Sequence, residues 1–333
     1  MQTLVTGATG FIGFHTARRL RECGHDVRVL VRDKEKALRV LGPLGIKKDA
    51  IVVGDMTDAD AVERALVGCD SVVHAAAGVS VTTGQTDFSA NLRGTETVIG
   101  RACGRGMYTI FVSSVMAIFT SKEPMTGDSP LVRSKTHYGR SKTECDAWVR
   151  DRQATGASVA IVYPPGVVGP DDPGFSESVK AYRAFLRGTL KSEGGNQLVD
   201  ARDLAQLFVR MLEEKTPGRI IAGGHFFDWD QFTTMLETAT GARISRITAP
   251  GWVLRFAARA MDVIGKLTGK TMPMTGEGIE IATRFAPMHD SRQVAELGVA
   301  WRPAVATVAD LFRWYVDAER LPPKAVPALL PVD

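Results

Sequence analysis

A tyrosine and a lysine four residues apart, Tyr138 and Lys142, are the side chains of this sequence best suited to moving a proton. On a helix, positions four apart lie on one face, so a phenol and an ammonium can point into one cavity. A nearby cation favours phenolate over phenol and lowers the pKa of a tyrosine from its usual value of about 10. The pair could therefore exchange a proton with a carbonyl group, although the same spacing also occurs on helices that only meet solvent.

A glycine-rich run near the N-terminus could hold a dinucleotide. Thr6-Gly7-Ala8-Thr9-Gly10-Phe11-Ile12-Gly13 follows a strand-like segment and opens a helical one. Gly7 permits the tight turn, Gly10 lets the backbone approach a pyrophosphate, and Gly13 lets the helix pack closely on the strand. This context favours a dinucleotide site over a plain glycine turn. The candidate cofactor residues here are Gly7, Thr9, Gly10, Phe11, Ile12 and Gly13.

The end of the second expected strand decides which dinucleotide binds. A carboxylate there would accept hydrogen bonds from the ribose 2′-hydroxyl, whereas a guanidinium would pair with a 2′-phosphate. The sequence has Arg32 at this point, with Lys34 and Lys36 close behind, so it favours NADP over NAD. The alternative is that Arg32 is a solvated charge and Asp33 binds the ribose.

The composition is that of a globular protein. The 333 residues are 44% hydrophobic, enough for a large core, and the net charge of +4 is spread out, which does not indicate nucleic-acid binding. The histidines show no metal-ligand spacing, so no metal is expected. A strand-like run directly after Met1 leaves no room for a signal peptide, and cysteines far apart fit the reducing cytoplasm. These cysteines are Cys23, Cys69, Cys103 and Cys145.

Short β-branched runs alternate with helical patterns through the first half, which predicts an α/β fold with a Rossmann-type doubly wound parallel sheet. Expected strands are Gln2 to Thr6, Val27 to Val31, Ala50 to Val53, Ser71 to His74, Thr109 to Ser113 and Val159 to Tyr163, with helices such as Ile12 to Cys23 and Asp58 to Leu66 between them. We expect a dinucleotide-binding domain over 1–165. A smaller, mostly helical substrate lobe would span 166–333, with about 197–222 returning to the sheet.

Within the second region the patterns predict helices, short strands and a loosely held end. The expected helices are Ser176 to Leu186, Asp203 to Glu214, Trp229 to Thr240, Trp252 to Lys266 and Val305 to Arg320, and the strands are Gln197 to Val199, Arg219 to Ile221 and Arg243 to Ile247. The proline-rich stretch from Pro322 to Pro331 reads as a tail.

Together, these motifs resemble those of the extended short-chain dehydrogenase/reductase superfamily, over nearly the whole chain. Besides the glycine loop and the Tyr-Lys pair, the matching segments are Gly54-Asp55-Met56, His74-Ala75-Ala76-Ala77, Phe88-Ser89-Ala90-Asn91-Leu92-Arg93-Gly94-Thr95, Ser114, and Pro164-Pro165-Gly166-Val167-Val168-Gly169-Pro170. The strand end at Arg32 and the Val-Val-Gly-Pro loop look most similar to the branch of dihydroflavonol-reductase-like and 3β-hydroxysteroid-dehydrogenase-like proteins.

The resemblance assigns roles to individual residues. It implies that Tyr138 donates or accepts the proton, that Lys142 holds the nicotinamide ribose and lowers the pKa of the tyrosine, and that Ser114, rather than Ser113, hydrogen-bonds the substrate oxygen. Asn91 would position a water, or would only make a buried contact. The cofactor contacts it implies beyond the glycine loop are Arg32, Lys36, Asp55, Met56, Ala75, Ala76, Ala77, Tyr138, Lys142, Tyr163, Pro164 and Val167.

The substrate side is less defined. Tyr163-Pro164 replaces the Arg-Pro of many superfamily members, and Gly166 stands where sugar-nucleotide enzymes often have asparagine, which weakens a nucleotide-sugar interpretation. The 252–270 segment is apolar over a broad face, with a basic stripe of Arg255, Arg259, Lys266 and Lys270. It could wall an apolar pocket, rest peripherally on a lipid surface, or be a core helix whose charges meet water.

Three functions are therefore considered. The first is an NADP-dependent ketone or aldehyde reductase, or the reverse alcohol dehydrogenase, acting as a monomer or homodimer on a fairly apolar substrate. The second is an epimerase or dehydratase with a tightly held cofactor. The third is a regulatory protein that binds NADP without catalysis, which the complete set of Ser114, Tyr138 and Lys142 disfavours.

Overall fold

The computed structural model describes residues 1–77, 89–120, 124–134, 137–268 and 276–330. Within these ranges the side chains at 137, 138, 262–268 and 277 lie outside the description.

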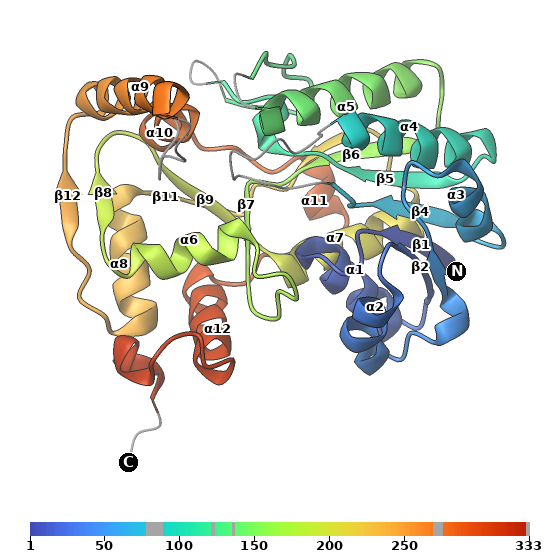
Figure 1. Cartoon of the computed structure of the whole chain (residues 1–333), viewed down its shortest axis with the longest axis horizontal. Helices are drawn as coiled ribbons and strands as arrows, with labels where there is room; N and C mark the ends of the chain where they lie inside the picture. Colours follow the sequence, from blue (N-terminus) through green and yellow to red (C-terminus); the bar gives the residue numbers. More distant parts are fainter. Residues whose placement is uncertain (78–88, 121–123, 135–136, 269–275, 331–333) are drawn as a thin grey trace.

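A seven-stranded parallel sheet forms the centre of the larger half (Figure 1), with strand order β10-β6-β5-β4-β1-β2-β3. Its strands carry runs of β-branched and aromatic residues, and all positions of β5 and β6 are buried, as expected for a sheet covered on both faces. The chain order reverses between β1 and β4, which is where this type of fold binds ligands. The strands are β1 Gln2–Thr6, β2 Asp26–Val31, β3 Ile51–Val53, β4 Ser71–His74, β5 Tyr108–Val112, β6 Val159–Tyr163 and β10 Arg219–Ile221.

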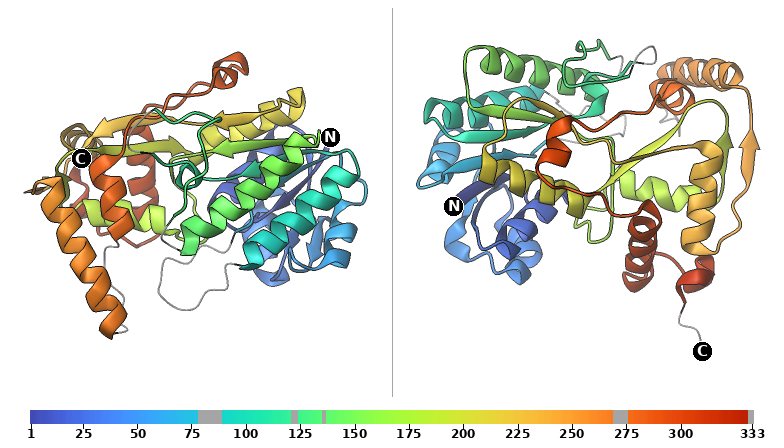
Figure 2. Two further views of the ribbon diagram at one scale, coloured as in Figure 1. Left: turned by 90° about the horizontal axis from the view of Figure 1, so that it is seen from above. Right: turned by 180° about the vertical axis from the view of Figure 1, so that it is seen from behind.

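Helices cover both faces of this sheet, so the predicted α/β doubly wound fold is confirmed. One layer consists of α1 Phe11–Glu22, α2 Lys34–Leu41 and α7 Ala201–Glu214, and the other of α3 Ala59–Leu66, α4 Ser89–Gly104 and α5 His137–Ala154 (Figures 1 and 2). α1 packs along α7, and α4 packs between α3 and α5. Short 3-10 turns η1 Gly42–Leu44, η2 Lys48–Ala50 and η3 Val115–Ala117 connect these elements.

The rest of the chain forms a smaller, helix-rich lobe. A three-stranded sheet of β7 Gly166–Val168, β9 Gly195–Asp200 and β11 His225–Asp228 joins it to the larger half, and β8 Thr189–Lys191 pairs with β12 Arg246–Thr248. Its helices are α6 Glu177–Phe185, α8 Trp229–Thr240, α9 Gly251–Thr268, α10 Gly276–Arg284, α11 Arg292–Glu296 and α12 Ala304–Asp317, followed by the 3-10 turns η4 Pro323–Ala325 and η5 Pro327–Leu329.

Two expectations for this lobe were wrong, and one helix was not expected. The strand expected from Arg243 starts at Arg246, and α10 was not predicted because glycines at 276 and 278 lower its helix propensity. The proline-rich end is not loosely held. The side chain of Val326 is fully buried, and η5 packs against α8, because the prolines set two short 3-10 turns that direct Val326 into the core.

Candidate active site

The glycine loop has the shape that a dinucleotide requires. Gly7 adopts a φ of +74°, and its carbonyl accepts a hydrogen bond from the N–H of Gly10 at 2.9 Å. A Cβ on Gly13 would overlap the Gly7 carbonyl, whereas one on Gly10 would meet only that oxygen, at 3.3 Å. In α1, all of which is described, Gly10 offers no side-chain cap and the first turn has no acidic residue, so its N–H groups suit an anion. The residues present therefore fit a pyrophosphate.

The segment after β4 lies directly against this loop. The N–H of Ala75 donates to the Thr6 carbonyl at 3.3 Å, and that of Ala76 donates to the Thr6 hydroxyl, also at 3.3 Å. A Cβ added to Gly7 would come within 2.8 Å of the Ala76 nitrogen. Ala75 and Ala76 thus line one side of the loop at the switch point, where the resemblance expects a cofactor, and Ala77 follows them in the chain.

At the ends of β2 and β3, the charged groups have distinct partners. Arg32 is exposed, whereas the Asp33 carboxylate caps α2 by accepting a hydrogen bond from the N–H of Lys36 at 2.9 Å. Asp55 accepts hydrogen bonds from the Thr57 N–H at 2.9 Å and from its hydroxyl at 2.7 Å. The backbone bond is the main reason that the pKa of Asp55 is lowered, and the positive charge of Arg32 contributes. Arg32 therefore stands near Asp55, on the surface where an adenosine would lie.

Other predicted cofactor residues border the same edge of the sheet. Met56 packs against α4 at Gly94, where an added Cβ would come within 2.5 Å of the Met56 Cγ. The Pro164 carbonyl accepts a hydrogen bond from the N–H of Val115 at 3.2 Å, and Val167 is buried. These contacts join the loop after β3 to α4, and the loop after β5 to the loop after β6.

His74, the last residue of β4, connects the elements around the switch point. Its Nδ1 lies 2.8 Å from the Thr6 hydroxyl and its Nε2 lies 3.2 Å from the Thr95 hydroxyl, so the ring joins β1, β4 and α4. Burial, and secondly the positive charge of Lys142, lower the pKa of His74 from 6.5 to about 3. The ring is therefore neutral at physiological pH.

Lys142 and Ser114 both lie at the carboxyl end of β5. The Lys142 side chain is almost fully buried, and its Nζ donates to the carbonyl of Val112 at 3.4 Å. Ser114 lies two residues beyond Val112, is partly exposed, and caps η3 by accepting a hydrogen bond from the Met116 N–H at 3.2 Å. α5 begins at His137, so Tyr138 stands one turn before Lys142 on the same helix, while the tyrosine side chain lies outside the described residues.

Ser113, next to Ser114, has a different environment. Its hydroxyl donates to the fully buried carboxylate of Asp146 at 2.5 Å. The Tyr163 hydroxyl also donates to this carboxylate, at 3.0 Å, and Arg150 pairs with it at 2.8 Å. Burial outweighs these donors and raises the pKa of Asp146. The cluster engages the hydroxyl of Tyr163, which is fully buried, and the Tyr163 carbonyl accepts a hydrogen bond from the N–H of Ala222 at 3.2 Å.

The sequence reasoning missed Asp146. Its signal was available, because Asp146 follows Lys142 by four residues and Tyr138 by eight, and therefore shares their helix face. Asn91 makes a comparable contact from α4, since its side-chain amide donates to the Ser141 hydroxyl at 2.9 Å and both residues are buried. A buried contact, one of the two alternatives for Asn91, is therefore present.

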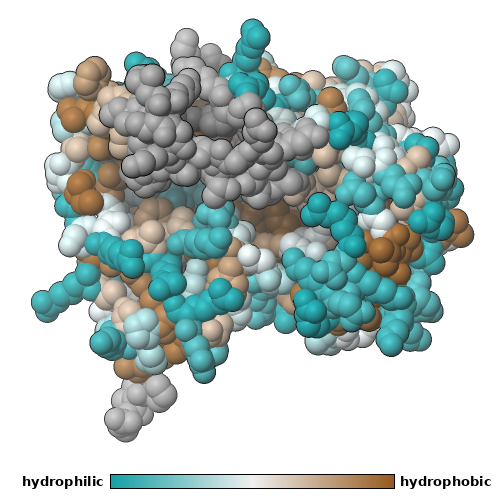
Figure 3. Space-filling model, viewed as in Figure 1, coloured by the Kyte–Doolittle hydropathy of each residue, from teal (hydrophilic) through white to brown (hydrophobic). Residues whose placement is uncertain are grey.

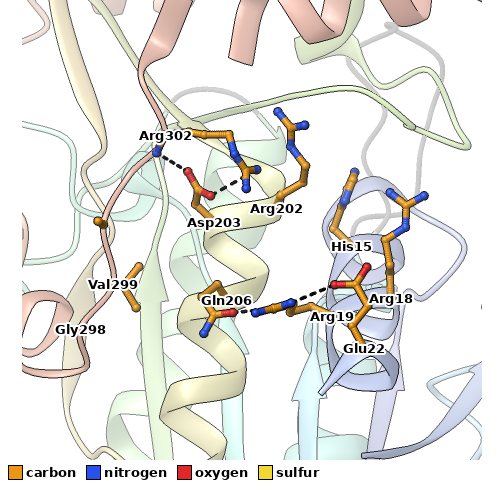
Figure 4. A pocket seen from close by; sticks show the side chains of 11 residues that line it. His15, Arg18, Arg19, Glu22, Arg202, Asp203, Gln206, Gly298, Val299 and Arg302 are labelled. Carbon is orange, nitrogen blue, oxygen red and sulfur yellow. Dashed lines mark hydrogen bonds and ion pairs between the residues drawn. The ribbon is translucent and has the colours of Figure 1, made fainter. Parts of the chain in front are cut away.

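A cavity of about 580 Å³ lies elsewhere, between α1, α7 and the 298–302 segment (Figure 4). No candidate catalytic residue lines it, and its charged groups are largely paired, such as Arg302 with Asp203 at 3.3 Å. Two of its lining residues lie on α1: His15 donates through Nε2 to the carbonyl of Pro170 at 3.0 Å, and Arg18 pairs with Asp171 at 2.8 Å. These two bonds connect the nucleotide-loop helix to the loop that follows β7.

Known proteins resemble the chain over most of its length. A putative dihydroflavonol 4-reductase of Synechocystis sp. is 28% identical over 328 residues, covering 93% of both chains. A 3-beta-hydroxysteroid dehydrogenase of Mycolicibacterium neoaurum is 25% identical over 348 residues, covering 95% of this chain and 92% of that protein. These relatives agree with the predicted branch and support an oxidoreductase.

Solved structures share the fold. The crystal structure of gox2253 superposes with a TM-score of 0.80 at 27% identity, covering 96% of this chain and 99% of that one. A UDP-glucose 4-epimerase from Bifidobacterium longum, in complex with NAD+ and UDP, has a TM-score of 0.71 at 20% identity with the same coverage, which shows the fold alone. Residues 3–223 match the NAD dependent epimerase/dehydratase family as a whole. The chain therefore belongs to this family, within the extended short-chain dehydrogenase/reductase superfamily that its motifs predicted.

Proposed function

We propose that the protein is an NADP(H)-dependent oxidoreductase that interconverts a carbonyl and a secondary alcohol on a fairly apolar substrate, with Tyr138 as the general acid or base. The observation that carries the proposal is that Lys142 and Ser114 both lie at the carboxyl end of β5, on the same edge of the sheet as a glycine loop that fits a dinucleotide. A bound nicotinamide would supply or accept the hydride, and the chain would position the substrate and handle the proton.

Ser114, Lys142 and Tyr138 have distinct roles in this proposal. The Ser114 hydroxyl, which already accepts a bond from Met116, keeps its own proton to donate to the substrate oxygen. Lys142, anchored on the Val112 carbonyl, would hold the nicotinamide ribose and favour the ionised form of Tyr138. Tyr138 would give its proton to the oxygen during reduction and take it back during oxidation.

The preference for NADP rests on the neighbouring residues Arg32 and Asp33. Arg32 is exposed beside Asp55, where a guanidinium can pair with a ribose 2′-phosphate. Asp33 uses a carboxylate oxygen to cap α2, which competes with a role on the ribose hydroxyls of NAD. Lys36 would assist through its ammonium.

An apolar substrate is supported by the names of the two relatives, which concern a dihydroflavonol and a hydroxysteroid. We also propose that residues 166–333 form the substrate lobe, with β10 and α7 belonging to the dinucleotide domain. The reducing cytoplasm is the proposed compartment, because the four cysteines are free thiols.

The function can be tested by following NADPH absorbance with a panel of ketones, aldehydes and secondary alcohols that includes sterols and flavonoid-like compounds. The proposal expects turnover with at least one apolar compound and a loss of that turnover in Lys142→Ala. Dinucleotide that stays bound through purification and is never consumed would instead indicate an epimerase or dehydratase.

A further inference from the structure

The helix α9 presents an aromatic surface to solvent. Trp252 is 68% exposed and Phe256 is 72% exposed, and their spacing of four places them on one face. Val253 is 37% exposed, and Ile247 on β12 is 58% exposed. These four residues are among only nine large hydrophobic side chains that are exposed in the described ranges. We call Trp252, Val253 and Phe256 the α9 face.

The rest of α9 is attached to the protein, so the exposure of this face does not result from a detached helix. Ala258, on the opposite side, is fully buried, and α9 packs against α10. The N–H of Gly251 donates to the Glu193 carboxylate at 3.0 Å, and Arg255 donates to the Thr283 hydroxyl at 2.9 Å. Figure 2 shows α9 projecting from the body of the protein, and Figure 3 shows hydrophobic surface at the end that carries it.

Basic residues accompany the α9 face. Arg259 is exposed, and it stands three residues after Phe256 and seven after Trp252, which places it beside them on the helix surface. By sequence, α9 carries Arg255, Arg259 and Lys266 against one acidic residue, Asp262. Exposed aromatics next to basic groups are the combination that binds the surface of an anionic bilayer, where aromatic rings enter the headgroup region and cations meet lipid phosphates.

A dimer formed through the α9 face fits the observations less well. Aromatic side chains bury at most about 150–250 Å² each, so three partly exposed residues supply less than the about 800 Å² that each partner of a stable dimer buries. In such a dimer the positive charges of the arginines beside the two faces would repel each other, whereas anionic lipid would neutralise them. None of the described helices is long and apolar enough to cross a membrane.

We propose that the α9 face docks the protein peripherally on anionic lipid membranes, with Trp252 and Phe256 inserted at the headgroup level and Arg259 against lipid phosphates. This proposal goes beyond the enzymatic function and does not depend on it. A lipid surface would also hold the apolar substrate class suggested for the enzyme.

Flotation of the full chain with vesicles tests the docking without any turnover. Vesicles of phosphatidylcholine alone are compared with vesicles that also contain phosphatidylglycerol. We expect the protein to float with the anionic vesicles, less so as salt rises. Brominated lipid should quench part of the tryptophan fluorescence of the unmodified protein, and that part should be missing from the variant that lacks Trp252. In the double variant Trp252→Ser/Phe256→Ser, the fraction of protein bound to anionic vesicles should be about tenfold lower, or less, than in the unmodified protein. Arg259→Glu should also weaken binding.

Val67→Ser is the matched control, because Val67 is 59% exposed at the end of α3, far from α9 in Figure 1. The control should float like the unmodified protein, and thermal melts should show that all variants are folded. Three results would overturn the proposal. They are no flotation with either vesicle, equal flotation of the double variant and the control, or a dimer in sedimentation experiments that the double variant abolishes.

Discussion

The hydroxyl of Ser113 donates a 2.5 Å hydrogen bond to the buried carboxylate of Asp146, and this bond separates the roles of two adjacent serines. Ser113 connects the end of β5 to α5, the helix that carries Tyr138 and Lys142. Ser114 stays partly exposed at the same strand end, with a proton to donate. The sequence alone could not separate the two, because both follow the strand directly.

The two serines should therefore differ when each is replaced by alanine. Ser114→Ala should lower kcat by about 100-fold or more, as expected for the loss of a donor to the reacting oxygen. Ser113→Ala should mainly lower the free energy of unfolding, by about 1–3 kcal/mol, because it removes a donor from a buried carboxylate. Steady-state kinetics and urea denaturation of both variants check this. A larger kcat loss in Ser113→Ala would reverse the assignment.

Asp146 should be important for stability. Asp146→Ala leaves the guanidinium of Arg150 and the hydroxyls of Ser113 and Tyr163 without their shared acceptor, and should cost about 3–5 kcal/mol of unfolding free energy. Asp151→Ala, on an exposed position of the same helix, is the matched control and should change stability by less than about 0.5 kcal/mol. Equal denaturation midpoints for the two variants would contradict the role given to the Asp146 cluster.

Arg32 should set the cofactor preference. A charge-assisted bond to the 2′-phosphate is worth about 1.5–3 kcal/mol, so Arg32→Ala should reduce the ratio of NADPH to NADH affinity by about 10- to 100-fold. Arg39→Ala removes an exposed arginine from α2 and should leave the ratio unchanged. Fluorescence titration with both dinucleotides measures the ratio. If the ratio is the same in Arg32→Ala and in the unmodified protein, the proposed NADP preference is wrong.

His74 should make folding sensitive to mild acid. Its pKa in the folded protein is about 3, below its ordinary value of 6.5, so only the unfolded chain takes up the proton on mild acidification. The contribution is fully present above about pH 6.5 and is lost as the pH falls toward about 3.

Between about pH 7.5 and pH 5.5, His74 should account for a loss of roughly 1 kcal/mol of unfolding free energy. Glutamine at this position can still donate and accept hydrogen bonds but does not titrate. The loss of unfolding free energy over the same pH interval should therefore be smaller in His74→Gln than in the unmodified protein, by the amount that His74 contributes. Urea denaturation at both pH values provides the comparison, since all other groups are common to the two proteins. An identical loss in His74→Gln would show that His74 does not titrate in this way.

The sequence predicted the central sheet well because its signals are local. The strands at Gln2 to Thr6, Ser71 to His74 and Val159 to Tyr163 have the predicted bounds, since each is a short apolar run between turn residues. The glycine loop was predictable for the same reason. By contrast, Arg243 to Ile247 was placed too early, because an exposed edge strand lacks a strong hydrophobic pattern.

The contacts around the site were less accessible to sequence reasoning. The clusters at Asp146 and His74 join residues on several strands and helices. The spacing in the sequence places Asp146 on the helix face of Tyr138 and Lys142, but it does not reveal that the carboxylate is buried or that Ser113 and Tyr163 donate to it. Tyr163 illustrates the limit. Its place at the end of β6 was predicted, but the direction of its side chain, toward Asp146, depends on the packing of α5.

The most direct test of the central claim is the kcat of Tyr138→Phe, measured with NADPH and an apolar ketone that the unmodified protein reduces, together with the affinity of the variant for NADPH. If Tyr138 transfers the proton, kcat should fall by about 100- to 10,000-fold while NADPH affinity changes little. Turnover equal to that of the unmodified protein, at unchanged NADPH affinity, would contradict the proposed mechanism.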